Sequence, residues 1–143
     1  APMLPSIIKR MHEAKVKNKK LEVWGDGSPL REYTYSQDMA NAFLWCFENY
    51  SSRAIINIGS NEEKSIREIV YYIAECLDFD KKNIIFDTSK PTGVQKKSMN
   101  NKNFLELSNY KFLSLQDGIK KTTDWYIKSY NENKEGVKIN SKN

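Results

Sequence analysis

The residues of this sequence that are best suited to chemistry would bind anions rather than break bonds. Trp24 ends the alternating stretch Leu21-Glu22-Val23-Trp24, and a glycine-rich turn separates it from Arg31. An indole at a strand end can offer its ring face to a base or a sugar, although an ordinary packed tryptophan fits this spacing equally well. The guanidinium fork of Arg31 matches two phosphate oxygens, and each charge-assisted hydrogen bond is worth roughly 1.5–3 kcal/mol. We therefore expect Trp24 and Arg31 to be neighbours at a diphosphate site.

Other cations could contact the same anion. Arg10 is one of only four arginines in a chain that otherwise prefers lysine, which favours a bidentate role. The polar loop from Thr88 to Met99 carries Lys90, Lys96 and Lys97. Long irregular loops are often binding loops, so we expect this one to close over the anion.

The sequence shows no catalytic or metal-binding centre. His12 is the single histidine, and no partner for it is placed by spacing, so a packed or surface histidine is the favoured interpretation. Gly25-x-Gly27 begins like a dinucleotide fingerprint, but an extended stretch follows where a helix should begin, which predicts a hairpin turn. Tyr130-x-x-x-Lys134 straddles a helix end, and one such match is expected by chance among eight tyrosines.

Hydrophobic periodicity predicts alternating helices and strands, and hence an α/β fold. The expected helices are Leu4–Lys19, Ser36–Tyr50 capped by Ser36, one after the capping box Ser65/Glu68, Asn101–Leu107, and Leu115–Tyr130; the expected strands are Leu21–Trp24, Arg31–Tyr35, Ala54–Gly59 and Asn83–Asp87. On the last helix, the residues expected to face the core around Trp125 are Ile119, Thr122, Thr123, Tyr126 and Ile127. Residues 1–130 are predicted to form one domain. Residues 131–143 have the composition of a disordered tail.

Two segments have more apolar surface than this small chain can cover. The helix from Ser36 to Tyr50 is apolar on more than one side, and Ala54–Gly59 has the pattern of a strand buried on both faces of a parallel sheet. Residues 36–59 are therefore expected to pack on a domain that this chain does not contain. Left alone, such a patch would favour self-association.

The composition excludes few classes of partner or function. A net charge of +5 and a pI near 9.1 allow any polyanionic partner, so a basic nucleic-acid-binding module stays an alternative, although most of the lysines are spread as on solvated helix faces. No apolar run approaches the roughly 18 residues that span a bilayer. Cys46 and Cys76 lie in apolar helical patterns, which favours free thiols and, weakly, a reducing cytoplasmic location.

Several spaced stretches also resemble one family, the GDP-L-fucose synthases. They are, in order, Leu4-Pro5-Ser6-Ile7-Ile8-Lys9-Arg10-Met11-His12-Glu13-Ala14, Val23-Trp24-Gly25-Asp26-Gly27-Ser28-Pro29-Leu30-Arg31-Glu32, Ile56-Asn57-Ile58-Gly59, Ser65-Ile66-Arg67-Glu68 and Phe86-Asp87-Thr88-Ser89-Lys90-Pro91-x-Gly93. The resemblance is colinear from about Met3 to Tyr130. It implies the carboxyl-terminal, substrate-binding portion of an extended short-chain dehydrogenase, without most of the Rossmann domain that binds NADP(H).

The resemblance also implies functions for particular residues. Arg10, Trp24 and Arg31 stand at positions that contact the GDP-sugar, and so do Lys90 and Thr92 on the loop, with Lys96 as a further candidate. Thr92 replaces an aspartate of the family, which leaves the exact nucleotide and sugar open. Pro2 replaces an epimerase histidine, so either the first residues are not native or the epimerase step is lost and ketone reduction remains.

By the same resemblance, the serine, cysteine and Tyr-x-x-x-Lys groups that carry catalysis precede Ala1, so the fragment alone is expected to be inactive and to bind no cofactor. The whole protein is expected to be a homodimeric NADP-dependent reductase or epimerase/reductase. Another nucleotide-sugar epimerase or dehydratase is the nearer alternative. Neither nucleic acid nor a membrane is an expected partner.

Overall fold

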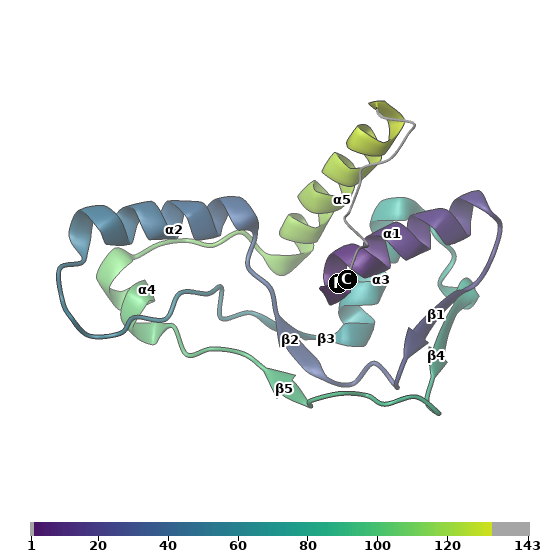
Figure 1. The fold of residues 1–143 in the computed structure, drawn as a ribbon, viewed down its shortest axis with the longest axis horizontal. Coiled ribbons are helices and arrows are strands. Elements are labelled where there is room, and N and C mark those ends of the chain that lie inside the picture. The colour runs from purple at the N-terminus through teal and green to yellow at the C-terminus, as the bar shows by residue number, and fades with distance from the viewer. Residues whose placement is uncertain (1, 133–143) are drawn as a thin grey trace.

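The computed structural model describes residues 2–132 and has the α/β architecture expected from the sequence (Figure 1). Helices α1, α3 and α5 pack together at one end beside strands β1 and β4, while α2 and α4 lie together at the other end. In chain order the elements are α1 (Met3–Val16), β1 (Leu21–Trp24), β2 (Leu30–Glu32), α2 (Ser36–Asn49), β3 (Glu63–Ser65), α3 (Ile66–Leu77), the 3₁₀ turn η1 (Lys81–Asn83), β4 (Ile84–Asp87), β5 (Lys96–Lys97), α4 (Lys102–Ser108) and α5 (Leu115–Glu132).

Helix α3 is the centre of the hydrophobic core, and its start confirms the predicted capping box. The Ser65 hydroxyl accepts the Glu68 N–H (3.1 Å), and the Glu68 carboxylate accepts the Ser65 N–H (2.9 Å). These reciprocal bonds satisfy two donors that a helix end otherwise leaves unpaired. Ile69, Val70 and Ile73 then recur at helical spacing and are completely buried against α1 and α5.

The strands form two small sheets rather than the predicted hairpin. Strand β1 pairs with β4 in parallel, whereas β2 pairs with β3 in antiparallel and with β5 in parallel orientation. The hairpin was wrong because the turn between β1 and β2 is bound to the start of α3. The carbonyl oxygens of Gly27 and Pro29 accept the N–H groups of Arg67 and Ile66, each at 2.9 Å.

The predicted strand Ala54–Gly59 was also wrong. This segment is irregular, and the Ile55 side chain is 91% exposed. A strand needs a hydrogen-bonded neighbour, and none of the strands in residues 2–132 pairs with this segment. The chain here is apolar in sequence but uncovered in the structure.

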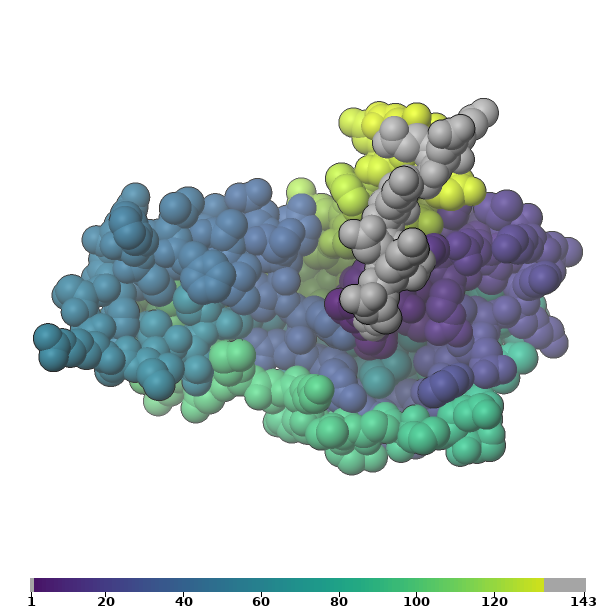
Figure 2. All heavy atoms as spheres, in the orientation of Figure 1, coloured from purple at the N-terminus to yellow at the C-terminus, as the bar shows by residue number. Residues whose placement is uncertain are grey.

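Helix α2 forms as expected, but Ser36 is its first helical residue and gives it no side-chain cap. Its apolar side chains face solvent, with Phe43, Leu44 and Phe47 exposed by 59%, 60% and 89%. Residues 36–59 lie at one end of the molecule, drawn in blue in Figure 2. The excess apolar surface read from the sequence is therefore present on this end.

The last helix buries three of its predicted core residues, but its core face is not centred on Trp125. Ile119, Thr123 and Tyr126 are buried, whereas Trp125 is 61% exposed. One residue corresponds to about 100° around a helix, so Trp125 points away when Tyr126 points inward. Helix α5 continues to Glu132, which takes the first two residues of the predicted tail; the rest of that tail, including Lys134, lies outside the described residues.

His12 is buried among aromatic rings of α5. Its ring lies edge-on to Tyr126 and Tyr130, with centroids 5.5 and 4.5 Å away, and its Nδ1 atom has no hydrogen-bond partner within the described part of the chain. Burial lowers the pKa of His12, and Glu13 and Lys15 nearby act in opposite directions. His12 is therefore a core residue.

We expect the folded protein to lose stability as the pH falls from about 7 to 5. The unfolded chain binds a proton at His12 below about pH 6.5, whereas the buried ring in the folded protein resists it, so acid favours unfolding by at most about 1.4 kcal/mol per pH unit. His12→Phe should remove this dependence, because no other histidine titrates in this window. Urea unfolding of both proteins at pH 7 and pH 5 measures it, and equal slopes would contradict the prediction.

Candidate anion-binding site

Trp24 lies at the carboxyl end of β1, beside the loop that joins β4 to β5. Its ring is 61% exposed on the solvent face of the strand. The Lys90 ammonium lies 5.9 Å from the centre of the indole ring, within the range of a cation–π contact. Thr92 packs against Gly25, the residue that follows Trp24. A Cβ atom on Gly25 would come within 2.7 Å of the Thr92 methyl group. Trp24, Lys90 and Thr92 therefore form one surface.

Arg31 lies in the middle of β2, where the same loop passes it. Its Nη1 donates to the Leu30 carbonyl oxygen (2.7 Å), and its Nη2 lies 3.7 Å from the Cβ position of Gly93. None of the ion pairs within residues 2–132 includes Arg31. The loop thus connects Trp24 with Arg31, although the two strands that carry them are not paired.

The register of the three-stranded sheet places two further cations on the Arg31 face. Lys64 on β3 and Lys97 on β5 are the direct neighbours of Arg31, and directly paired residues share one face of a sheet. Lys64 has Glu68 at 3.9 Å, whereas Lys97 takes part in no ion pair within the described chain. Like charges directly opposite one another destabilise a sheet, so this face is suited to an anion that neutralises them.

Lys96, also a predicted site residue, lies on the opposite face. It pairs with Leu30, and its ammonium forms an ion pair with Glu63 at 2.8 Å. Hydrogen bonds from Lys96 and Ser98 lower the pKa of the Glu63 carboxyl. Strand alternation shows that only one of the two adjacent lysines can share the Arg31 face; the sequence does not show which, because that depends on register.

Arg10 lies on α1 and contacts β1 before the strand reaches Trp24. Its guanidinium donates to the carbonyl oxygen of Glu22, two residues before Trp24, which corresponds to about 7 Å along a strand. Arg10 is exposed and lines a separate groove with Lys17, Lys19 and Lys20. The structure thus places Trp24, Lys90 and Thr92 together at the end of β1, and Arg31 with Lys97 on the face of β2. It adds Lys64, which the sequence did not single out.

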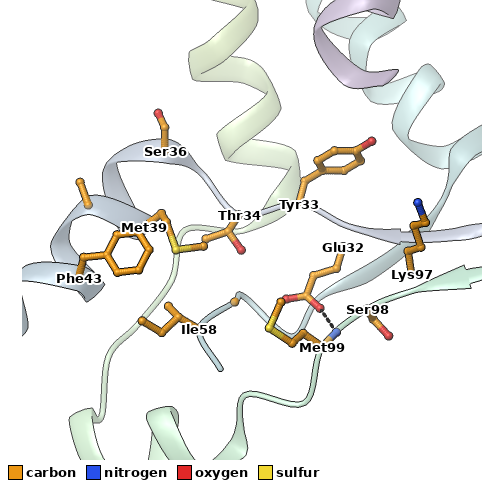
Figure 3. A pocket seen from close by; sticks show the side chains of 12 residues that line it. Glu32, Tyr33, Thr34, Ser36, Met39, Phe43, Ile58, Lys97, Ser98 and Met99 are labelled. Carbon is orange, nitrogen blue, oxygen red and sulfur yellow. Dashed lines mark hydrogen bonds between the residues drawn. The ribbon is translucent and has the colours of Figure 1, made fainter. Parts of the chain in front are cut away.

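A cavity of about 750 Å³ lies beside Lys97, between the end of β2, the start of α2 and residues 97–99 (Figure 3). Its walls are mainly apolar, with Tyr33, Thr34, Met39, Phe43, Ile58 and Met99 among the lining side chains, and Lys97 and Glu32 at its polar side. The volume is sufficient for a small-molecule ligand.

The residues that the structure brings together here carry cations, a hydroxyl and an aromatic ring. Within residues 2–132, no three His, Cys, Asp or Glu side chains are grouped as ligands of a metal ion. The same part of the chain contains no helix with the length and hydrophobicity that a membrane crossing needs. What the site can do chemically is to hold an anion beside an aromatic ring.

Comparison with known proteins shows what this chain is similar to. The model of the NAD dependent epimerase/dehydratase family matches residues 1–59. The sequence is 38% identical over 128 residues to GDP-L-fucose synthase 1 of Arabidopsis thaliana, covering 89% of this chain and 39% of the relative. The chain therefore spans about two fifths of the length of the curated relatives that it matches.

Solved structures also match this chain over about two fifths of their own length. The crystal structure of a GDP-L-fucose synthetase from Naegleria fowleri matches with a TM-score of 0.86 at 33% identity, over 92% of this chain and 40% of that one. The structure of that protein bound to NADP matches with a TM-score of 0.85 at 32% identity, over 92% and 41% of the two chains. The α/β fold described above is thus part of the fold of these proteins.

Proposed function

Since this chain is a homologue of the GDP-L-fucose synthases, of which it spans about two fifths, we propose that it is the substrate-binding part of an NADP-dependent reductase or epimerase/reductase that acts on a GDP-linked sugar. The observation that carries the proposal is the cationic face of β2 beside the exposed ring of Trp24. Arg31 and Lys97 hold the diphosphate. Trp24 and Lys90 contact the nucleoside or the sugar, and Arg10 adds a further donor.

The described residues do not fit the cofactor itself. Gly25 and Gly27 are the only glycines separated by one residue, and the space beside them is filled. A Cβ atom on Gly27 would lie 2.7 Å from the Phe86 ring, so no pyrophosphate can approach the backbone there. We propose that NADP(H), which supplies the hydride when bound, is held by other residues of the whole protein.

The exposed apolar face of α2 also supports a separate cofactor-binding domain in the whole protein. Phe43, Leu44 and Phe47 form a surface that a soluble protein normally covers. We propose that this face, with the irregular segment 54–59, packs against the cofactor-binding domain of the whole protein. The half-exposed free cysteines Cys46 and Cys76 are compatible with a reducing cytoplasm, which we keep as the proposed location.

Two residues bear on the reaction and on the nucleotide. Pro2 occupies the N-cap position of α1 and has no titratable side chain, so it supports reduction without the epimerase acid. Thr92 lies against the Gly25 turn, next to Trp24, where its hydroxyl offers one donor in place of a carboxylate. A nucleotide other than GDP is the alternative that this substitution favours.

Thermal unfolding in the presence of nucleotides tests the proposal. We expect GDP at 100 times its Kd to stabilise the whole protein by about 2.7 kcal/mol, because it binds only the folded state. UDP and dTDP should give clearly smaller shifts at the same concentration. Stabilisation by UDP or dTDP but not by GDP would assign another nucleotide sugar, and no shift with any of the three would refute a nucleotide-sugar site.

A further inference from the structure

The segment that carries Lys97 has very little regular structure to hold it. Strand β5 consists of Lys96 and Lys97 alone, paired with Leu30 and Arg31 of β2. Before it, the Leu30 N–H donates to the Gln95 carbonyl oxygen (2.7 Å). So short a ladder specifies its register weakly, and a one-residue slip would exchange Lys97 for Lys96 on the Arg31 face.

The side chain of Glu32 extends this ladder beyond its last strand residue. Its Oε2 atom accepts the Met99 N–H at 3.0 Å, two residues after Lys97 (Figure 3). Its Oε1 atom accepts the Asn61 N–H at 3.1 Å. One carboxylate thus joins the end of the binding loop to the turn that precedes β3, and both bonds are of the charge-assisted kind.

The surroundings of Glu32 are shaped around its carboxylate. A Cβ atom on Gly59 would overlap Oε1, so a larger residue there would displace the carboxylate. Asn61 adopts the left-handed conformation (φ +59°) that turns its N–H toward Oε1. The turn is also held by Thr34, whose hydroxyl accepts the Ser60 N–H at 3.0 Å. The Asn61 side of the contact is therefore anchored independently, whereas the Met99 side depends on Glu32.

We propose that Glu32 is a positioning residue for the ligand site: it fixes the register of residues 95–99 and thereby places Lys97, and not Lys96, beside Arg31. The inference rests on the proposed function, because Lys97 matters only if an anion binds there. Glu32 itself need not touch the ligand. It acts through the backbone of Met99.

Glu32→Gln is the variant that tests this role, because a carboxamide has one oxygen and can keep only one of the two acceptor positions. The Met99 N–H is the partner expected to be released. In the whole protein we expect faster hydrogen exchange at the Met99 amide and GDP binding about tenfold weaker, the effect of losing one charge-assisted contact. Lys97→Ala should weaken GDP binding by about the same factor.

The double variant Glu32→Gln/Lys97→Ala separates positioning from general damage. Because Glu32 acts through Lys97, the double variant should bind GDP about tenfold and not about 100-fold more weakly than the wild type. The control is Glu62→Gln, since Glu62 lies in the same turn but accepts the Leu115 N–H (2.6 Å) at the start of α5. It should leave Met99 exchange and GDP affinity unchanged.

The possible outcomes distinguish the two proposals. Wild-type protein that binds no GDP would overturn the proposed function and, with it, the role of Glu32 in binding. Normal wild-type binding with multiplicative effects of the two substitutions, or with GDP affinity unchanged in Glu32→Gln, would overturn the positioning role alone. Equal losses in Glu32→Gln and Glu62→Gln would also overturn it.

Discussion

Replacing Arg31 by alanine is expected to weaken GDP binding by the whole protein roughly 100-fold, which is the largest effect on binding that the site predicts. A guanidinium that donates two charge-assisted bonds to a diphosphate contributes roughly 1.5–3 kcal/mol with each, and the lower limit for two bonds, about 3 kcal/mol, corresponds to slightly more than 100-fold. Its removal also leaves Lys97 and Lys64 without the central cation of their face. Titration calorimetry with GDP measures the change.

Two further variants show whether geometry or charge is responsible. Arg31→Lys keeps the charge but not the planar fork, so it should restore only part of the affinity. Arg53→Ala is the control, because Arg53 is exposed in the bend after α2, away from the sheet that carries Arg31. If Arg53→Ala weakened GDP binding as much as Arg31→Ala, net charge would explain the effect and the diphosphate clamp would be refuted.

The largest expected effect on stability belongs to Gly27, in the turn between β1 and β2. Gly27→Ala should reduce the free energy of unfolding by about 2–5 kcal/mol, combining about 1–2 kcal/mol for an L-residue at positive φ with about 1–3 kcal/mol for overpacking. The backbone φ is +79°, and a Cβ atom would lie 2.7 Å from the Phe86 ring and 2.9 Å from the Arg67 side chain. Arg67 also stacks on Phe86 at 4.0 Å, so neither neighbour yields easily.

Gly93→Ala is the matched control for this substitution. Gly93 has nearly the same φ, +76°, but the nearest atom to its Cβ position is Arg31 Nη2 at 3.7 Å. Only the conformational strain should remain, at about 1–2 kcal/mol. Urea unfolding of both variants compares them, and equal losses would show that the packing of the β1–β2 turn contributes nothing.

Local features were predictable from the sequence because neighbouring residues alone determine them. The capping box of Ser65 and Glu68 and the apolar spacing of α3 depend on contacts within one or two turns of helix. Strands β1 and β4 followed from short apolar runs bounded by turn residues. The resemblance to a family rests on the same short stretches, and the relatives confirm it.

Features that depend on distant partners were predicted poorly. A glycine-rich turn between two extended segments normally closes a hairpin, but here the start of α3, about 40 residues later, binds the turn and separates the strands. Residues 54–59 have the sequence of a buried strand, yet no strand in the described chain lies beside them. In both cases the deciding hydrogen bonds join residues that no local pattern relates.

The predicted anion site likewise has a part that the sequence determines and a part that depends on distant partners. From the sequence alone it followed that Trp24 and Arg31 flank one turn and that a lysine-rich loop follows β4, because residue type and spacing are enough for that. Only the tertiary structure decided that Lys97 rather than Lys96 shares the Arg31 face. The physical reason is that a strand presents adjacent residues to opposite sides, so the face depends on a register that the backbone of Met99 and the carboxylate of Glu32 help to set.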